Sequence, residues 1–241
     1  MISTEIKQNY PLKEYYKEIY QRYDLVNRVF TFGQDRKWRS FAVEACLENK
    51  PKRILDLCTG TGDLILEIGE KASNSPHLVG YDFSSEMLSL AVEKAKSNEN
   101  LPDFIEGNVA EMPFENNYFD TAGISFGIRN LVYENSDAKK HLSEIHRVIR
   151  PGGNFVILES SKPGNMLWRI VNGIYLRLIL PYLGGAISGN LKAYRYLGKS
   201  SRNYYTQQEM SDILQAAGFR VVKKRALFLG SVMLLVAEKQ M

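Results

Sequence analysis

The feature that most constrains this chain is a glycine-rich turn that follows a short apolar run. The apolar run covers residues 53–58, the turn contains Gly60-Thr61-Gly62, and a helical pattern begins directly after it. Glycines permit a sharp turn close to a ligand, and the next helix offers backbone N–H donors. A dinucleotide fingerprint would need a third glycine where the chain has Ile65. The turn therefore argues against an NAD-binding oxidoreductase and predicts another nucleotide-like ligand.

Strand and helix patterns alternate after residue 53. Apolar runs predict strands at 53–58, 77–82, 103–107, 119–126 and 154–160, with helices at 62–72, 84–98 and 137–149 between them. This alternation is typical of right-handed βαβ units, in which helices cover both faces of a parallel sheet. A helix at 206–217 and two strand-like runs at 220–229 and 231–239 end the chain. Because Gly230 is the turn residue between these runs, we expect them to pair antiparallel.

Two helical regions lie outside this alternation, and we expect one domain over 1–241 to hold them both. Residues 1–50 predict N-terminal helices, at 4–22 and 35–48, and an insertion covers 162–203. Within the insertion, the pattern at 164–185 is a long apolar helix. One interpretation is a helix that packs over the sheet edge. The other is an apolar lid over a greasy substrate that also touches a membrane surface.

The long apolar helix is imperfectly amphipathic. At about 100° per residue, its more polar positions gather on one side, where a leucine interrupts them. These positions are Arg169, Asn172, Gly173 and Arg177, and the interrupting residue is Leu176.

Composition limits the classes of partner. The 241 residues are 44% hydrophobic and carry a net charge of +4, which is too mild to favour a nucleic-acid partner. The same charge suits weak attraction to an anionic membrane surface. Cys46 and Cys58 lack metal or redox spacing, so we expect reduced thiols and no metal site. We expect a cytoplasmic protein, because the N-terminus lacks an apolar run of signal-peptide type.

The glycine turn resembles the first motif of the class I S-adenosylmethionine-dependent methyltransferases. That resemblance implies a Rossmann-like, mostly parallel seven-stranded sheet with an antiparallel C-terminal hairpin, and S-adenosyl-L-methionine as cofactor. Asp82 closes the second predicted strand, where a carboxylate can accept hydrogen bonds from both ribose hydroxyls. A helix cap is its alternative role, for which Ser84 competes. The residues expected to bind the cofactor are Asp56, Gly60, Thr61, Gly62, Asp82, Asn108, Val109 and Ser125.

Four further segments resemble the ubiquinone/menaquinone biosynthesis C-methyltransferases of the demethylmenaquinone methyltransferase type. They are the 147–163 segment, the Tyr23-Asp24…Asn27…Phe32-Gly33…Trp38 pattern, the 125–130 segment and Tyr194-Arg195-Tyr196-Leu197. Departures include Val26, Asp35 and Ser160, where members often have methionine, histidine and phenylalanine. The resemblance implies C-methylation of a polyprenylated hydroquinone, with demethylmenaquinol as the first choice. It also implies peripheral association with the inner face of the membrane, and we keep a homodimer as one expectation.

The chemistry of such a reaction indicates the acceptor residues. A ring carbon becomes nucleophilic when a neighbouring phenol loses its proton, so the site must stabilise a phenolate. Arg129 follows the fourth predicted strand and is the first candidate, because a fixed positive charge favours phenolate over phenol. Asn130 can donate a hydrogen bond to a ring oxygen. Glu159 is either a base or an anchor for an arginine. We expect Tyr194, Arg195 and Trp168 to bind substrate.

Two alternatives to this reading remain open. One is a methyltransferase that acts on another small or lipid acceptor. The other is a non-catalytic, cofactor-binding scaffold of a quinone-synthesis complex. The presence of both Asp82 and the glycine turn argues against the scaffold.

Overall fold

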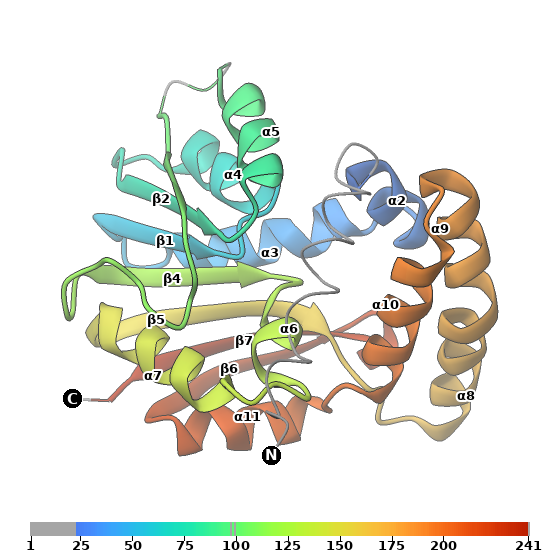
Figure 1. Cartoon of the computed structure of the whole chain (residues 1–241). Coiled ribbons are helices and arrows are strands. Elements are labelled where there is room, and N and C mark those ends of the chain that lie inside the picture. Colours follow the sequence, from blue (N-terminus) through green and yellow to red (C-terminus); the bar gives the residue numbers. More distant parts are fainter. Residues whose placement is uncertain (1–22, 97, 99, 241) are drawn as a thin grey trace, which may run out of the picture.

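A mixed sheet of seven strands forms the centre of the molecule in a computed structural model that describes residues 23–96, 98 and 100–240 (Figure 1). The strands are β1 (Arg53–Leu57), β2 (His77–Asp82), β3 (Asp103–Glu106), β4 (Phe119–Ser125), β5 (Ile149–Ser160), β6 (Phe219–Leu227) and β7 (Val232–Lys239). Their order is β3-β2-β1-β4-β5-β7-β6, and β7 runs antiparallel to both neighbours while β1 to β5 are parallel. The predicted sheet is confirmed; the predicted helix at 4–22 lies outside the described residues.

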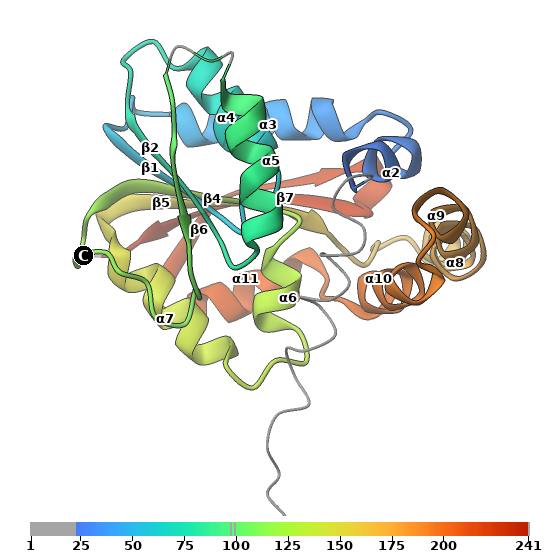
Figure 2. The same ribbon diagram turned by 45° about the horizontal axis from the view of Figure 1, so that its top comes forward.

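Helices cover both faces of the sheet (Figure 2). On one face lie α3 (Asp35–Leu47), α4 (Asp63–Lys71) and α5 (Ser85–Ala95); on the other lie α6 (Ile128–Val132), α7 (Ala138–Val148) and α11 (Gln207–Ala216). Successive side chains of a strand point to opposite faces. In β1, Ile54 therefore packs with α3 and α4, whereas Leu55 and Leu57 pack with α7 and α11. Each strand thus needs apolar residues at consecutive positions, which is the pattern seen in the sequence.

Two strand boundaries differ from the prediction by more than one residue. β5 begins at Ile149 rather than 154, because the chain pairs with Phe119 before a bulge and resumes pairing at Asn154. β6 ends at Leu227, two residues early. Phe228 and Leu229 have φ of 45° and 55° and form a turn with Gly230. Apolar residues seldom adopt positive φ. The strand-like composition of these two residues therefore predicted that the strand continues through them.

The insertion forms a helical layer beyond the carboxyl ends of the parallel strands (Figure 1). It consists of α8 (Met166–Ile174), a π-helical segment η2 (Tyr175–Ile179), α9 (Leu180–Ser188) and α10 (Leu191–Asn203). Close backbone approach holds these helices together. A Cβ at Gly198 of α10 would lie 2.2 Å from the carbonyl oxygen of Leu176, and one at Gly184 would lie 2.5 Å from the ring of Tyr194.

The long helix of the insertion leaves many of its apolar side chains exposed instead of burying them. Asn172, on the more polar side, lines the internal pocket, while Leu180 is buried against the short helix α2 (Tyr23–Phe30). Leu167 and Ile174 are 77% and 52% exposed. The helix therefore turns Asn172, Leu176 and Leu180 inward and presents many of its apolar side chains to the outside.

Candidate active site

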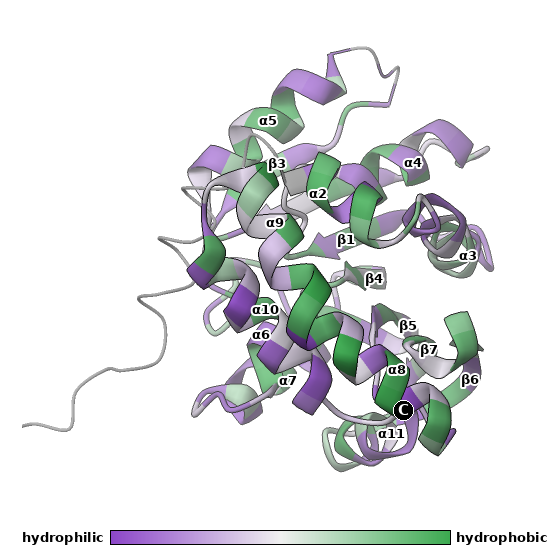
Figure 3. Ribbon diagram, turned by 90° about the vertical axis from the view of Figure 1, so that its right-hand side faces the viewer, coloured by the Kyte–Doolittle hydropathy of each residue, from purple (hydrophilic) through white to green (hydrophobic). Residues whose placement is uncertain are grey.

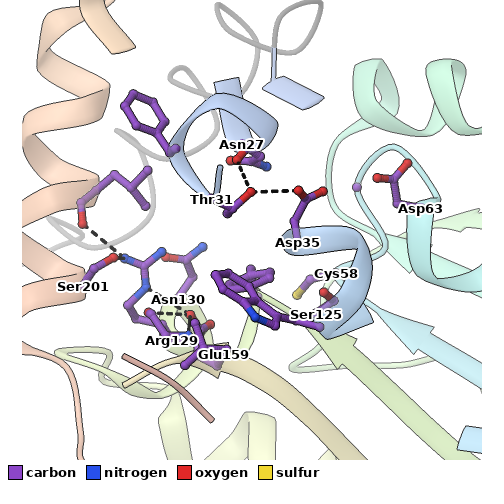
Figure 4. A pocket seen from close by; sticks show the side chains of 18 of the residues that line it. Asn27, Thr31, Asp35, Cys58, Asp63, Ser125, Arg129, Asn130, Glu159 and Ser201 are labelled. Atoms are coloured by element: carbon purple, nitrogen blue, oxygen red, sulfur yellow. Dashed lines mark hydrogen bonds and ion pairs between the residues drawn. The ribbon is translucent and has the colours of Figure 1, made fainter. Parts of the chain in front are cut away.

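One pocket lies where the carboxyl ends of the parallel strands meet α2, α3 and the insertion (Figure 4). Ligands in open α/β sheets bind at this edge. Of the residues predicted to form the site, those that line the pocket are Asp56, Gly60, Thr61, Asp82, Ser125, Arg129, Asn130, Glu159 and Tyr194. Residues from the ends of four parallel strands, β1, β2, β4 and β5, or from their following turns thus share one cavity with residues of the helical layer.

The glycine turn brings the backbone to the pocket wall. Gly60 and Gly62 have φ of 56° and 82°, and Gly62 precedes the first residue of α4. Gly60 and Thr61 line the pocket, whereas Gly62 packs against α5, where an added Cβ would lie 3.0 Å from the Cβ of Ala91. The first glycine therefore allows approach to a ligand, and the second allows two helices to pack closely.

Two buried carboxylates stand on neighbouring strands at one end of the pocket. Asp82 accepts hydrogen bonds from the backbone N–H of Gly60 and of Ser84, both at 2.9 Å, and burial raises its pKa. Ser84, not Asp82, caps α5 through a bond from the N–H of Met87. Burial raises the pKa of Asp56 to about 7, although the hydroxyl of Thr59 donates a hydrogen bond to it. A cation or paired hydroxyl donors would offset the cost of these buried charges.

An ionic network ties α2 to the glycine turn. The ammonium of Lys94 on α5 contacts the carboxylates of Asp24 and Asp63, at 2.5 and 2.8 Å. Thr61 donates to the other oxygen of Asp24, at 2.8 Å. Arg39 of α3 reaches Asp63 from the opposite side, at 2.9 Å. The network thereby attaches α2 and α3 to the glycine turn and to the start of α4.

Arg129 connects β4 to the insertion. Its Nη1 donates to the hydroxyls of Ser200 and Ser201 on α10, at 2.6 and 2.9 Å. The side chain is 4% exposed, and Nε has no hydrogen-bond partner among the described residues. Nε lies 3.8 Å from Oε1 of Glu159, a longer distance than a hydrogen bond (Figure 4). A buried N–H donor beside the pocket is therefore still available to an acceptor oxygen.

Glu159 is fully buried and accepts several hydrogen bonds. Its Oε2 accepts from the backbone N–H of Arg129 at 3.2 Å. Its Oε1 accepts from the backbone and the hydroxyl of Ser160, both at 2.8 Å. Both oxygens are therefore used to fix local backbone and the neighbouring side chain.

A polar row on α2 and α3 was not singled out from the sequence. Thr31 donates both to the carbonyl of Asn27 and to the carboxylate of buried Asp35, at 2.8 and 2.7 Å, and all three residues line the pocket (Figure 4). Asp24, Asn27 and Trp38 belong to the resemblance already noted. The spacing of four residues between Asn27, Thr31 and Asp35 is the signal that could have grouped this row.

Besides Gly62, four candidate residues lie outside the pocket lining. Asn108 caps its own turn by accepting from the N–H of Ala110, and Val109 is buried in the core beside it. Trp168 donates through its indole N–H to Ser231 and packs on Phe228. Exposed Arg195 lies over the ring of Tyr182. Their roles in binding cofactor or substrate stay predictions.

The pocket has two chemically different ends that suit a methyl donor and its acceptor. Asp56 and Asp82 provide buried negative charge beside the accessible backbone of Gly60. The groups that fit there are ribose hydroxyls and a cationic ligand, so the residues fit S-adenosylmethionine. At the other end, Arg129 donates hydrogen bonds to α10, and Tyr175, Leu176 and Tyr194 of the insertion line the same pocket, which fits an aromatic acceptor with an anionic oxygen.

Comparisons with known proteins agree with this geometry. The chain is 43% identical over 206 residues to a demethylmenaquinone methyltransferase of Thermus thermophilus, which covers 86% of this chain and 91% of the relative. It is 37% identical over 231 residues to a ubiquinone/menaquinone biosynthesis C-methyltransferase of Geotalea daltonii, covering 95% and 96%.

A solved structure shows the same fold at low sequence identity. The magnesium protoporphyrin IX methyltransferase of Synechocystis, with bound SAH, superimposes with a TM-score of 0.67 at 15% identity, covering 97% of this chain and 100% of the other. Residues 3–239 match the model of the ubiE/COQ5 methyltransferase family. This chain belongs to the ubiE/COQ5 methyltransferase family.

Proposed function

We propose that this chain transfers a methyl group from S-adenosylmethionine to a ring carbon of a polyprenylated hydroquinone, converting demethylmenaquinol to menaquinol. The observation that carries the proposal is that Asp56, Asp82 and Arg129 all line the same pocket. The names of the similar proteins from Thermus and Geotalea support a quinone precursor as acceptor. The reaction belongs to quinone biosynthesis.

The cofactor, when bound, supplies an electrophilic methyl group on a sulfonium. The protein must then hold the acceptor carbon in line with that group and keep water away. Good alignment of two reactants contributes about 7–11 kcal/mol to lowering a barrier. The rigid contacts of the insertion around Gly184 and Gly198 suit that task.

Arg129 stabilises the phenolate in this proposal. Its buried Nε–H lacks a hydrogen-bond partner among the described residues, so a ring oxygen can accept that bond. The fixed charge lowers the pKa of the bound phenol and pushes electron density to the ortho carbon. Arginine stays protonated and does not act as the base, so water or another group removes the phenol proton.

Glu159 acts as an anchor for Arg129 rather than as the base. Both of its oxygens already accept hydrogen bonds from Arg129 and Ser160. Asn130 follows Arg129 in the pocket wall and can donate to the second ring oxygen.

We place this activity at the cytoplasmic, inner face of a membrane. A polyprenyl tail is lipid-soluble, and a peripheral enzyme can take such a substrate from the bilayer surface. The exposed apolar side chains of the insertion support this location.

An acceptor panel tests the proposed function. Purified enzyme receives methyl-labelled S-adenosylmethionine with reduced demethylmenaquinol, with a ubiquinol precursor, or with no acceptor, and the product is identified by mass spectrometry. We expect label on the naphthoquinol ring carbon. Label on neither quinol, in enzyme that binds the cofactor, would overturn the proposal.

A further inference from the structure

We propose that one continuous apolar surface docks this protein on an anionic lipid bilayer with the long helix lying in the membrane plane. The surface consists of the outer side of α8–η2–α9 and the neighbouring turn Phe228–Leu229. This inference rests on the proposed function, because a polyprenylated substrate is held in the bilayer. The proposal adds which surface meets the lipid, in which orientation, and with what headgroup charge.

The outer side of the long helix carries exposed apolar side chains from Met166 to Leu183. Figure 3 faces this side and shows hydrophobic residues along α8 and α9. The side chains concerned are between 41% and 77% exposed and are Met166, Leu167, Ile170, Val171, Ile174, Leu178, Ile179, Tyr182 and Leu183. Patches of this kind on soluble proteins mark protein or membrane contacts. An in-plane helix would bury such a face in the headgroup and acyl boundary.

A strained turn extends this surface. Phe228 and Leu229 are consecutive apolar residues at positive φ, and they are 40% and 71% exposed. The Phe228 ring lies 5.7 Å from that of Trp168 on α8. Backbone strain of this kind clusters at functional sites. Insertion of Leu229 into lipid would bury its exposed side chain.

The charge around the surface selects an anionic partner. Residues 160–208 contain no aspartate or glutamate, while seven lysines and arginines lie at positions 162, 169, 177, 192, 195, 199 and 202. The net charge of +4 therefore arises from the insertion, and the rest of the chain is net negative. Arg169 and Arg177 are exposed on the long helix itself. A cationic rim around an apolar face is complementary to anionic headgroups.

The inner contacts of the long helix show why it lies on the membrane instead of crossing it. The helix has 23 residues, Met166–Ser188, and a stretch of 18 of them has a mean hydropathy of 1.4, which by length and composition would allow a span. However, the hydroxyl of Tyr175 donates to the carbonyl of Phe30 at 2.7 Å, and the indole of Trp168 donates to Ser231. A spanning helix would break both bonds and remove one wall of the pocket.

The same helix therefore has a lipid side and a pocket side. Asn172, Tyr175 and Leu176 line the pocket from its inner side, and Phe228 lines it from the turn. Docking in this orientation would place the pocket directly above the lipid. A tail held in the bilayer would then reach the acceptor end without crossing water.

Vesicle sedimentation with the full chain tests this surface. Vesicles of phosphatidylcholine are compared with vesicles that also contain phosphatidylglycerol. We expect binding to the anionic vesicles that falls with added salt. Leu167→Ser and Leu229→Ser should each reduce partitioning about tenfold. Arg169→Gln combined with Arg177→Gln should reduce it about twentyfold on anionic vesicles and change it little on neutral ones.

Matched controls lie elsewhere on the surface. Leu101 is 62% exposed and Lys140 is half exposed, both away from the insertion, so Leu101→Ser and Lys140→Gln should leave partitioning unchanged. Methyl transfer to a tail-less naphthoquinol analogue in buffer is measured beside binding. Surface variants should keep this activity and lose only activity on vesicle-held quinol.

The outcomes separate docking from catalysis. Methylation of the soluble analogue without vesicle binding by the wild type would overturn the docking surface and leave the function intact. Vesicle binding without methylation of either acceptor would reject the function while the surface stands. A homodimer that Leu167→Ser dissociates, together with unchanged vesicle binding, would show that a second copy covers this face and would overturn the lipid assignment.

Discussion

The carboxylate of Glu159 accepts a hydrogen bond from the backbone of Arg129 and forms an ion pair with its guanidinium. Oε2 accepts from the Arg129 backbone N–H at 3.2 Å, and Oε1 lies 3.8 Å from the guanidinium Nε. The acid therefore fixes both the start of α6 and the charge that faces the pocket. A buried carboxylate used in this way positions another residue instead of exchanging a proton with substrate.

Glu159→Gln should lower kcat about tenfold while the affinity for cofactor changes less than twofold. Glutamine keeps the shape but weakens the hold on Arg129, and hydrogen bonds to charged groups contribute about 1.5–3 kcal/mol. The shape of the kcat–pH profile should not change, since Glu159 positions Arg129 and does not take the proton from the substrate in this proposal. Glu111→Gln, at an exposed site, is the control. Loss of one limb of the profile in Glu159→Gln would instead identify the acid as the base.

Asp56→Asn should stabilise the protein at high pH. Burial raises the pKa of Asp56 from 3.8 to about 7, so the favourable contribution is complete below 3.8 and is lost as pH rises through 7. Asparagine removes this dependence. The gain in unfolding free energy should be about 2 kcal/mol larger at pH 8 than at pH 5, measured by urea titration of the cofactor-free protein.

Asp120→Asn is the matched control for this experiment. The pKa of Asp120 is lowered because Arg150 and two backbone N–H groups bind its carboxylate, although burial opposes the shift. Its contribution is present above pH 3.8, so the variant should lose equal stability at pH 5 and pH 8. Equal effects of Asp56→Asn at both pH values would contradict the charged, desolvated state of Asp56. Asp56→Asn should also bind S-adenosylmethionine more weakly, because Asp56 lines the pocket.

Asp24→Asn should speed release of the cofactor. The substitution removes the negative charge that α2 offers to Lys94 and leaves Asp63 as its partner. Because both side chains are about one-third exposed, we expect a two- to fivefold faster dissociation, within the range of partly exposed ion pairs. Stopped-flow displacement measures the rate. Glu93→Gln removes a fully surface pair with Lys96 and should have no effect. An unchanged dissociation rate in Asp24→Asn would show that the contact between α2 and Lys94 does not retain the cofactor in the pocket.

Gly198→Ala should destabilise the insertion. Its Cβ would lie 2.2 Å from the carbonyl oxygen of Leu176, so α10 and η2 would have to separate. Overpacking of this kind costs about 1–3 kcal/mol, which lowers Tm by about 2–4 °C per kcal/mol in a chain of this size. Gly164→Ala meets no atom within 4 Å and should keep the wild-type Tm. Equal Tm values in calorimetry would show that the two helices are not packed rigidly.

The sheet and the position of Arg129 could be predicted because their signals are local. Apolar runs, Gly60 and the acids at 56 and 82 specify strand ends, and strand ends of a parallel sheet meet at one edge. The pocket brings Asp82 and Arg129 together as expected.

What could not be predicted depends on packing between distant segments. The inward side of the long helix is set by Gly184 and Gly198 and by the bond from Tyr175 to Phe30, which helical periodicity does not contain. The strained turn at Phe228 has strand-like composition, and its contact with Trp168 joins residues 60 positions apart. The ion pair between Lys94 and Asp24 could not be predicted either, because the two residues are 70 positions apart.

The most direct test of the account is single-turnover methylation of demethylmenaquinol by the wild type and by Arg129→Ala, with cofactor affinity measured in both. We predict that Arg129→Ala binds S-adenosylmethionine within about twofold of the wild type but methylates at least about 100-fold more slowly at neutral pH, with partial recovery as rising pH ionises the phenol. Wild-type rates in the variant, or a loss explained entirely by weaker cofactor binding, would contradict the central role of Arg129.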